Sequence, residues 1–236
     1  MLHTDLHECL GHASGRLLPG VDQDALKENG SALEEARADL FALYYLADPK
    51  LQELGILDNP NAYQAEYYKY MLNGLMTQLN RIEPGNDIEE AHMRNRQLIA
   101  KWVLENGKKK GKGGKDVVEL VKKNGKTFVK VNDYPKMREL FGNLLAEIQR
   151  IKSEGDYEGG KKMILKYAVK VDPKLHKEVL DRFSKLDIPP YRGFINPVYT
   201  PVYDQAGEIT DITISYPENY SEQMLRLSRD YSPLTK

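Results

Sequence analysis

Two histidines near the start of the chain have a spacing that indicates a metal site. His7 and His12 enclose the run His-Glu-Cys-Leu-Gly-His, and Glu35 follows 23 residues after His12. Two imidazoles and one carboxylate are a complete set of protein ligands for a catalytic zinc ion, which keeps its fourth position for water. Glu8 directly follows the first histidine and is the expected general base on that water. These residues therefore predict metal-assisted hydrolysis.

The spacing of the two histidines requires a distorted helix. In the common His-Glu-x-x-His motif the ligands are four residues apart, roughly 40° around a regular helix, whereas five residues give about 140°. A single π-bulge takes up the extra residue and returns both side chains to one face. Gly11 is the residue that tolerates this distortion best. We expect a helix over residues 3–13 with a bulge near residues 9–11.

Glu35 is expected on a second helix. Ser31 as N-cap and Glu34 three residues later fit a capping box, and apolar residues of helical period follow. Asp39 lies one turn after Glu35, where it could accept the free ring N–H of a zinc-bound histidine and orient that ligand. Arg37 should point elsewhere and pair with a carboxylate.

Each of these signals also has an ordinary structural explanation. A single histidine on a helix is usually structural, and glutamates at a helix start usually serve capping and the helix dipole. We prefer that explanation for Glu34. A short zinc motif also arises by chance, but the six-residue form combined with a glutamate on a following helix is far more specific. The combination favours zinc.

The motifs His-Glu-Cys-Leu-Gly-His and Glu-Glu-Ala-Arg-Ala-Asp resemble those of the dipeptidyl peptidase III family of zinc metallopeptidases. The short gap between them is similar to that in bacterial, Bacteroides-like members. The resemblance implies that His7, His12 and Glu35 bind one zinc ion and that Glu8 is the catalytic base. Asp39 matches the acidic residue that supports the ligands. Such enzymes release dipeptides from the N-terminus of short peptides and are cytoplasmic.

A third segment, residues 91–96, is similar to a family motif whose histidine stabilises the transition state. The resemblance implies this role for His92 and a substrate-binding role for Arg96, one helical turn later. Family members are longer than this chain, with a second, N-terminal lobe that supplies most groups for the free amine and backbone of the peptide. We therefore expect the chain to be the C-terminal portion of such an enzyme, able to bind zinc but weak or inactive alone.

Two alternatives stay open at this stage. One is a zinc-dependent endopeptidase of other specificity, and the other is a non-catalytic metal-binding module. A closed site with four protein ligands would favour the module, and His3, four residues before His7, is the nearest candidate for a fourth ligand. Peptides are the expected partners in either enzymatic case.

Composition gives no sign of a nucleic-acid or membrane partner. The 236 residues carry a net charge of −1, and no apolar run reaches the length of a membrane span. The single cysteine excludes an internal disulfide; we expect Cys9 to project away from the metal and pack in the core. The basic, glycine-rich residues 107–115 are interpreted as a solvated connector rather than a phosphate or nucleic-acid site.

The chain is expected to be mainly α-helical, with a helical zinc-binding catalytic lobe over residues 1–187 and a C-terminal α+β tail over residues 188–236. Asn124-Gly125 predicts a β-hairpin within residues 116–132. Pro189-Pro190 marks the boundary, and Arg192 is expected to face the cleft. Tyr63, Tyr67 and Tyr70 should pack in the core. Further helices are expected over residues 61–81, 88–104, 133–151, 157–169 and 173–186, and an exposed edge hairpin over residues 194–202 and 209–215.

Overall fold

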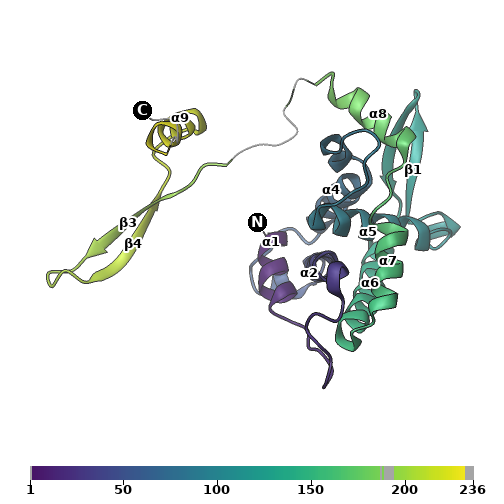
Figure 1. Cartoon of the computed structure of the whole chain (residues 1–236), viewed down its shortest axis with the longest axis horizontal. Coiled ribbons are helices and arrows are strands. Elements are labelled where there is room, and N and C mark those ends of the chain that lie inside the picture. The colour runs from purple at the N-terminus through teal and green to yellow at the C-terminus, as the bar shows by residue number, and fades with distance from the viewer. Residues whose placement is uncertain (1, 187, 189–193, 232–236) are drawn as a thin grey trace. The chain divides into compact units, whose positions relative to one another are not determined.

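The computed structural model describes residues 2–186, 188 and 194–231, and the chain divides into two compact units, Met1–Asp187 and Ile188–Lys236 (Figure 1). The fold is mainly α-helical, with two small antiparallel hairpins, as the sequence predicts. Pro189, Pro190 and Arg192, for which the sequence makes predictions, lie outside the described residues. None of the described helices is both long and apolar enough to cross a membrane.

The chain begins with helix α1 (Leu2–Leu6), which continues directly into the π-helix η1 (His7–His12). The N–H of Ala13 bonds to the carbonyl of Glu8, five residues earlier, so the predicted π-distortion is confirmed. Besides tolerating the π-distortion, Gly11 permits close packing of two helices. A Cβ at this position would lie 2.6 Å from the Cα of Ala38, so only glycine lets η1 approach the next long helix this closely.

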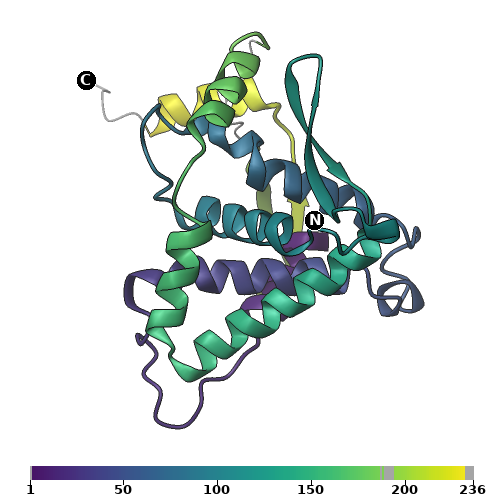
Figure 2. The same cartoon turned by 90° about the vertical axis from the view of Figure 1, so that its right-hand side faces the viewer.

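That next helix is α2 (Gly30–Leu46), which follows the 3₁₀ turn η2 (Lys27–Asn29) and precedes the short α3 (Lys50–Glu53). The predicted capping box is wrong. Asn29 is the N-cap, its side chain makes no capping bond, and Ser31 already lies inside the helix. Packing stabilises this helix instead of a cap, because α2 runs through the core against α1, η1, α5 and α6 (Figure 2).

The predicted helix over residues 61–81 is broken. It forms α4 (Tyr63–Leu75) and the 3₁₀ helix η3 (Thr77–Arg81), separated at Met76, whose φ of −138° is not helical. Helix α5 (Ala91–Asn106) starts after Ile88, later than predicted, because the Glu90 carboxylate accepts the N–H groups of His92 and Met93.

Helices α4 and α5 pack at a glycine. A Cβ on Gly74 would lie 2.4 Å from the carbonyl oxygen of Arg96, so a larger residue would push the two helices apart. This close crossing brings Tyr70, one turn before Gly74, to the same side as the first turns of α5.

The predicted hairpin is confirmed as strands β1 (Val118–Lys123) and β2 (Lys126–Val131). Asn124 and Gly125 both have positive φ, as a tight two-residue turn requires. The connector before it contains the 3₁₀ turn η4 (Lys112–Gly114) and is exposed over most of its length, with Gly107 buried.

Three further helices complete the first unit: α6 (Tyr134–Glu154), α7 (Tyr157–Tyr167) and α8 (Pro173–Phe183). Each begins at an aspartate whose side chain accepts N–H groups of the first turn. Figure 2 shows α6 crossing α2 obliquely, and the core lies between these helices and α5. The fully buried core side chains include Ala36, Leu40, Leu43, Tyr67, Met71, Leu98, Val103, Phe141, Leu144 and Ile148.

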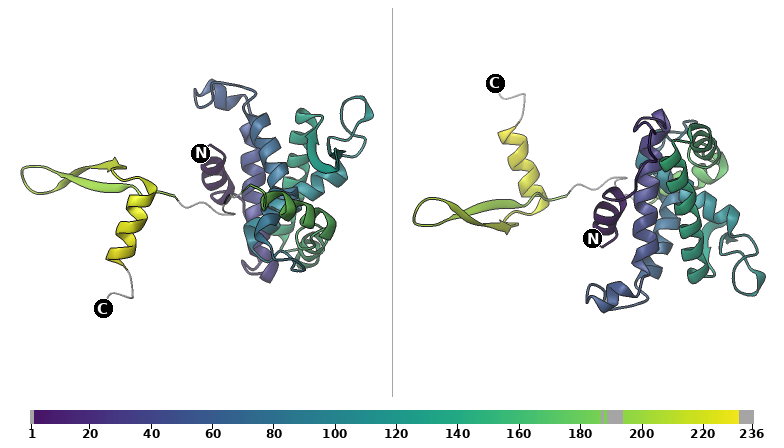
Figure 3. Two further views of the ribbon diagram at one scale, coloured as in Figure 1. Left: turned by 90° about the horizontal axis from the view of Figure 1, so that it is seen from above. Right: turned by 90° about the horizontal axis from the view of Figure 1, so that it is seen from below.

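The second unit consists of strands β3 (Val198–Tyr203) and β4 (Ile209–Ser215) and helix α9 (Tyr220–Asp230), drawn in yellow-green to yellow (Figure 3). The strands pair as a twisted antiparallel ribbon, with Tyr199 opposite Ile214 and Pro201 opposite Ile212. Almost all of its side chains are exposed, as predicted. Helix α9 begins at a capping box between Asn219 and Glu222.

Candidate metal centre

The π-helix η1 and helix α2 bring His7, His12 and Glu35 together. The Nε2 atoms of His7 and His12 lie 3.4 Å and 3.7 Å from Oε2 of Glu35. One ligand atom from each residue lies within 4.8 Å of the others. The two imidazole rings meet edge to face, with centroids 4.6 Å apart. The structure thus joins three residues that the sequence separates by up to 28 positions.

These three residues fit a zinc ion. Bond lengths of 2.0–2.1 Å in a tetrahedral site place neighbouring ligand atoms about 3.3 Å apart, close to the two distances from Glu35. The Oε2 atom of Glu35 is also buried and has no hydrogen-bond partner among the described residues. A buried carboxylate oxygen that accepts no hydrogen bond is costly, and a cation bound between it and the two imidazoles would remove that cost.

The other nitrogen of each ring is held by a carboxylate from α2. Nδ1 of His7 lies 2.7 Å from Oδ1 of Asp39, and Nδ1 of His12 lies 3.0 Å from Oε1 of Glu34. When Nδ1 carries the proton and donates to a carboxylate, Nε2 keeps its lone pair for a metal. Both rings are therefore oriented with Nε2 toward Glu35.

Glu34 lies at the candidate site, although the sequence interpretation assigned it to a helix cap. Its carboxylate accepts hydrogen bonds from Arg37, whose side chain is fully buried, and from Lys152 on α6. Burial alone would raise the pKa of Glu34, but the hydrogen bonds from Arg37, Lys152 and His12 lower it to about 2. The predicted pairing of Arg37 with a carboxylate is confirmed, and it keeps Glu34 ionised beside His12.

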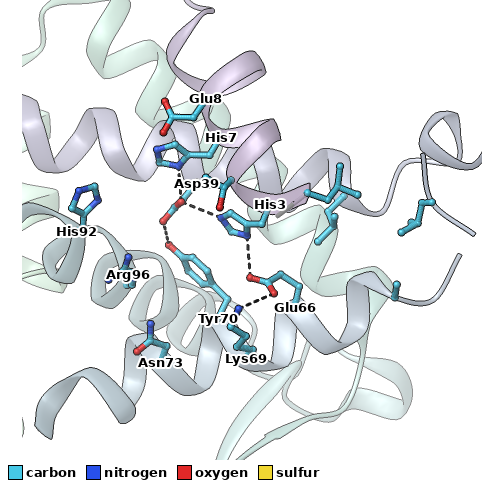
Figure 4. Close-up of a pocket in the computed structure, with 15 residues that line it drawn as sticks. His3, His7, Glu8, Asp39, Glu66, Lys69, Tyr70, Asn73, His92 and Arg96 are labelled. Atoms are coloured by element: carbon cyan, nitrogen blue, oxygen red, sulfur yellow. Dashed lines mark hydrogen bonds and ion pairs between the residues drawn. The ribbon is translucent and has the colours of Figure 1, made fainter. Parts of the chain in front are cut away.

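Asp39 accepts hydrogen bonds from three side chains (Figure 4). Besides His7, its Oδ1 atom faces Nε2 of His3 at 3.1 Å, and its Oδ2 atom accepts the Tyr70 hydroxyl at 2.7 Å. Burial opposes its ionisation, yet the hydrogen bonds from His3 and His7 hold the pKa of Asp39 well below its usual range. Tyr70, expected only as a core residue, thus also bonds the carboxylate that orients His7.

A cavity of about 490 Å³ adjoins His7 and is lined by Glu8, His92 and Arg96, among others (Figure 4). Glu8 is exposed, so its carboxylate is accessible to a substrate or to water. Nδ1 of His92 lies 3.3 Å from Oε2 of Glu35, and 52% of the His92 side chain is exposed. The structure therefore brings every residue singled out from the sequence motifs to one region.

The expectation for Cys9 is wrong, and His3, the candidate fourth ligand of the alternative interpretation, lies apart from the candidate zinc group. Cys9 is exposed rather than packed in the core, because the π-turn directs positions 8 to 10 toward solvent. His3 forms a possible ligand group with His7 and Asp39, but within the described part of the chain it does not join His12 and Glu35. The structure thus gives no fourth protein ligand at the candidate zinc site among the residues it describes.

Residues 20–182 of the chain match the model of peptidase family M49, which is well over half of the sequence. The chain belongs to peptidase family M49. The match includes the Glu34–Asp39 and His92–Arg96 segments and begins after the His7–His12 turn. The sequence matches no curated protein.

The chain also shares its fold with solved structures. The chain is similar to the structure of DPP III from Caldithrix abyssi, with 24% identity and a TM-score of 0.57, covering 78% of this chain and 32% of that one. It is also similar to dipeptidyl-peptidase III from Corallococcus sp. strain EGB, with 23% identity, a TM-score of 0.58, and coverage of 78% and 31%. This M49 chain thus shares their fold and spans about a third of their length.

Proposed function

We propose that the first unit of this chain is the zinc-binding catalytic lobe of a peptidase that releases dipeptides from the N-terminus of peptides. The observation that carries the proposal is the convergence of two oriented imidazoles on a buried oxygen of Glu35 that accepts no hydrogen bond among the described residues. Membership in a peptidase family supports hydrolysis of peptide bonds. The likeness in fold to two structures of dipeptidyl peptidase III supports the specificity.

Zinc held by His7, His12 and Glu35 would supply a Lewis acid that polarises the peptide carbonyl and acidifies water. The exposed carboxylate of Glu8, next to His7 in the chain, accepts the proton of the attacking water and returns it to the leaving amine. His92, at the edge of the same cavity, donates to the carbonyl oxygen as negative charge develops there.

Arg96 is the proposed substrate-binding residue. It lines the cavity one turn after His92 and carries a permanent positive charge. A guanidinium at this position can bind a peptide carbonyl or carboxylate and align the scissile bond with Glu8. Because the chain spans about a third of the matched structures, dipeptide release is proposed for the whole protein and zinc binding for this chain. Cytoplasmic localisation stays a prediction from the family resemblance.

Zinc binding is tested by stripping the protein with a chelator, reloading it and measuring bound metal. We expect one equivalent for the wild type and a loss of affinity of at least a hundredfold for Glu35→Gln. Glu139→Gln, an exposed change on α6, is the matched control and should keep the wild-type affinity. A folded wild-type protein that binds no zinc would contradict the proposal.

The reaction is tested with a chromogenic dipeptidyl substrate and its N-acetylated counterpart. Activity that requires a free amine and disappears in Glu8→Gln, with zinc retained, supports dipeptide release. Cleavage of the acetylated substrate at an equal rate would favour the endopeptidase alternative. Turnover unaffected by Glu8→Gln would refute the role of Glu8.

A further inference from the structure

A polar network lies behind His7, on the side away from the proposed metal. Its centre is Asp39, which accepts from three side chains: Nδ1 of His7 at 2.7 Å, Nε2 of His3 at 3.1 Å and the hydroxyl of Tyr70 at 2.7 Å (Figure 4). His3 comes from α1 and Tyr70 from α4, so two elements that supply no proposed ligand meet at this carboxylate.

Both ring nitrogens of His3 face carboxylates. Nε2 faces Asp39, and Nδ1 lies 3.2 Å from Oε1 of Glu66. Only the doubly protonated ring has a proton on each nitrogen to donate, so this arrangement favours the imidazolium. Burial lowers the pKa of His3, but the bonds to Asp39 and Glu66 outweigh it and raise the pKa to about 9.

Tyr70 fixes the position of His3 as well as that of Asp39. The two rings stack with centroids 5.8 Å apart and 12° between their planes, and the Tyr70 ring is buried. Glu66, from the same helix as Tyr70, lies beside Nδ1, the other nitrogen of the His3 ring. The imidazolium therefore has little freedom to leave Asp39.

The network has a consequence for His7. An Asp39 carboxylate held only by His7 could rotate, and this would release the Nδ1–H of His7. With His3 and Tyr70 in contact as well, both oxygens of Asp39 are occupied and the carboxylate is fixed in place.

We propose that His3 and Tyr70 are positioning residues that hold Asp39, and through it His7, in the orientation that metal binding requires. This inference rests on the proposed zinc site. It assigns a role to two residues that neither touch the proposed metal nor belong to the motifs that revealed it.

The alternative is that His3 is itself a metal ligand, because His3, His7 and Asp39 each offer an atom within 4.8 Å of the others. The observed hydrogen bonds argue against it. Both nitrogens of His3 and Nδ1 of His7 are engaged with carboxylates, so a cation here would have to displace the protons that the arrangement holds.

The test compares His3→Gln and Tyr70→Phe with two matched controls in the metal-free and zinc-loaded protein. His176→Gln removes another buried histidine, bonded to the carbonyl of Ile82, and Tyr67→Phe removes another buried hydroxyl of α4, bonded to the carbonyl of Leu43. Zinc affinity is measured by competition with a chromophoric chelator, and the visible spectrum of the cobalt-substituted protein reports ligand geometry.

We expect His3→Gln and Tyr70→Phe each to weaken zinc binding by about 10- to 100-fold and to alter the cobalt spectrum. Both controls should change thermal stability while leaving affinity and spectrum as in the wild type. If His3→Gln does not fold, Tyr70→Phe, which deletes one oxygen atom, decides the question.

Three results would overturn the inference. If the wild type binds zinc and the folded variants keep its affinity and spectrum, the inference is overturned while the proposed zinc site stands. A second zinc equivalent that disappears in His3→Gln would make His3 a ligand. A wild type that binds no zinc would contradict both the proposed function and this inference.

Discussion

Nδ1 of His12 lies 3.0 Å from Oε1 of Glu34, the residue immediately before the proposed ligand Glu35. Helix α2 therefore supplies a ligand oxygen and, one position earlier, the carboxylate that orients a ligand from another helix. Asp39, one turn later, has the same relationship to His7. A single helix thus determines the orientation of both imidazoles, and changes to its polar residues should affect metal binding without removing a ligand.

Replacing Glu34 by glutamine should weaken zinc binding about 10- to 100-fold, because a neutral amide orients His12 less firmly and makes its Nε2 a weaker donor. Affinity by chelator competition is the measurement. Lys152→Met is the control, since it removes another partner of Glu34 while leaving the contact with His12 intact. Equal affinities for Glu34→Gln and the wild type would show that the contact of Glu34 with His12 does not support metal binding.

Alanine variants of His12 and His92 should show that His12 is a zinc ligand and His92 is not. Both lie near Oε2 of Glu35, at 3.3 Å and 3.7 Å, but only His12 completes a ligand group with His7 among the described residues. His12→Ala should lose at least a hundredfold in zinc affinity, whereas His92→Ala should stay within about threefold. Where turnover is measurable, His92→Ala should lower kcat by about 10²–10³ with zinc retained. Loss of zinc in His92→Ala would make it a fourth ligand.

Gly11→Ala should destabilise the first unit by about 1–3 kcal/mol and weaken zinc binding, because its Cβ would meet Cα of Ala38 at 2.6 Å and push η1 from α2. Gly30→Ala is the matched control. Its backbone is helical and its nearest neighbour would lie 3.7 Å away, so it should be neutral or stabilising by up to about 1 kcal/mol. Chemical denaturation of metal-free protein measures both, and a tolerated Gly11→Ala would disprove the close packing.

The contribution of His3 to stability should depend on pH. Its folded-state pKa of about 9 is above the ordinary value of 6.5, so the stabilisation is fully present below pH 6.5 and is lost as the pH rises through 9. The difference between the unfolding free energies of the metal-free wild type and His3→Gln should therefore shrink by roughly 1–3 kcal/mol from pH 6 to pH 10. A gap that is constant over this range would mean that His3 is not held as an imidazolium.

The sequence by itself determined the parts of the fold that depend on neighbours in the chain. The five-residue spacing of His7 and His12 predicted the π-turn, because no regular helix places both on one face. Asn124-Gly125 predicted the hairpin turn, and the aspartates before α6, α7 and α8 mark their starts. The candidate ligands could also be selected from the sequence, since zinc accepts few residue types and the motifs supply three of them, and the structure brings these three together.

Tertiary structure alone decided what lies around those ligands. The sequence suggested that Glu34 belongs to a helix cap and that Tyr70 packs in the core, which are the common roles of such residues. Their contacts with His12 and Asp39 arise because α1, η1 and α4 each pack against α2, with Gly11 permitting the close approach of η1. Gly74 permits the close approach of α4 to α5. Contacts between segments tens of residues apart depend on how whole helices pack, which no local pattern records. The residues of the candidate metal site could therefore be selected from the sequence, and the network around them required the fold.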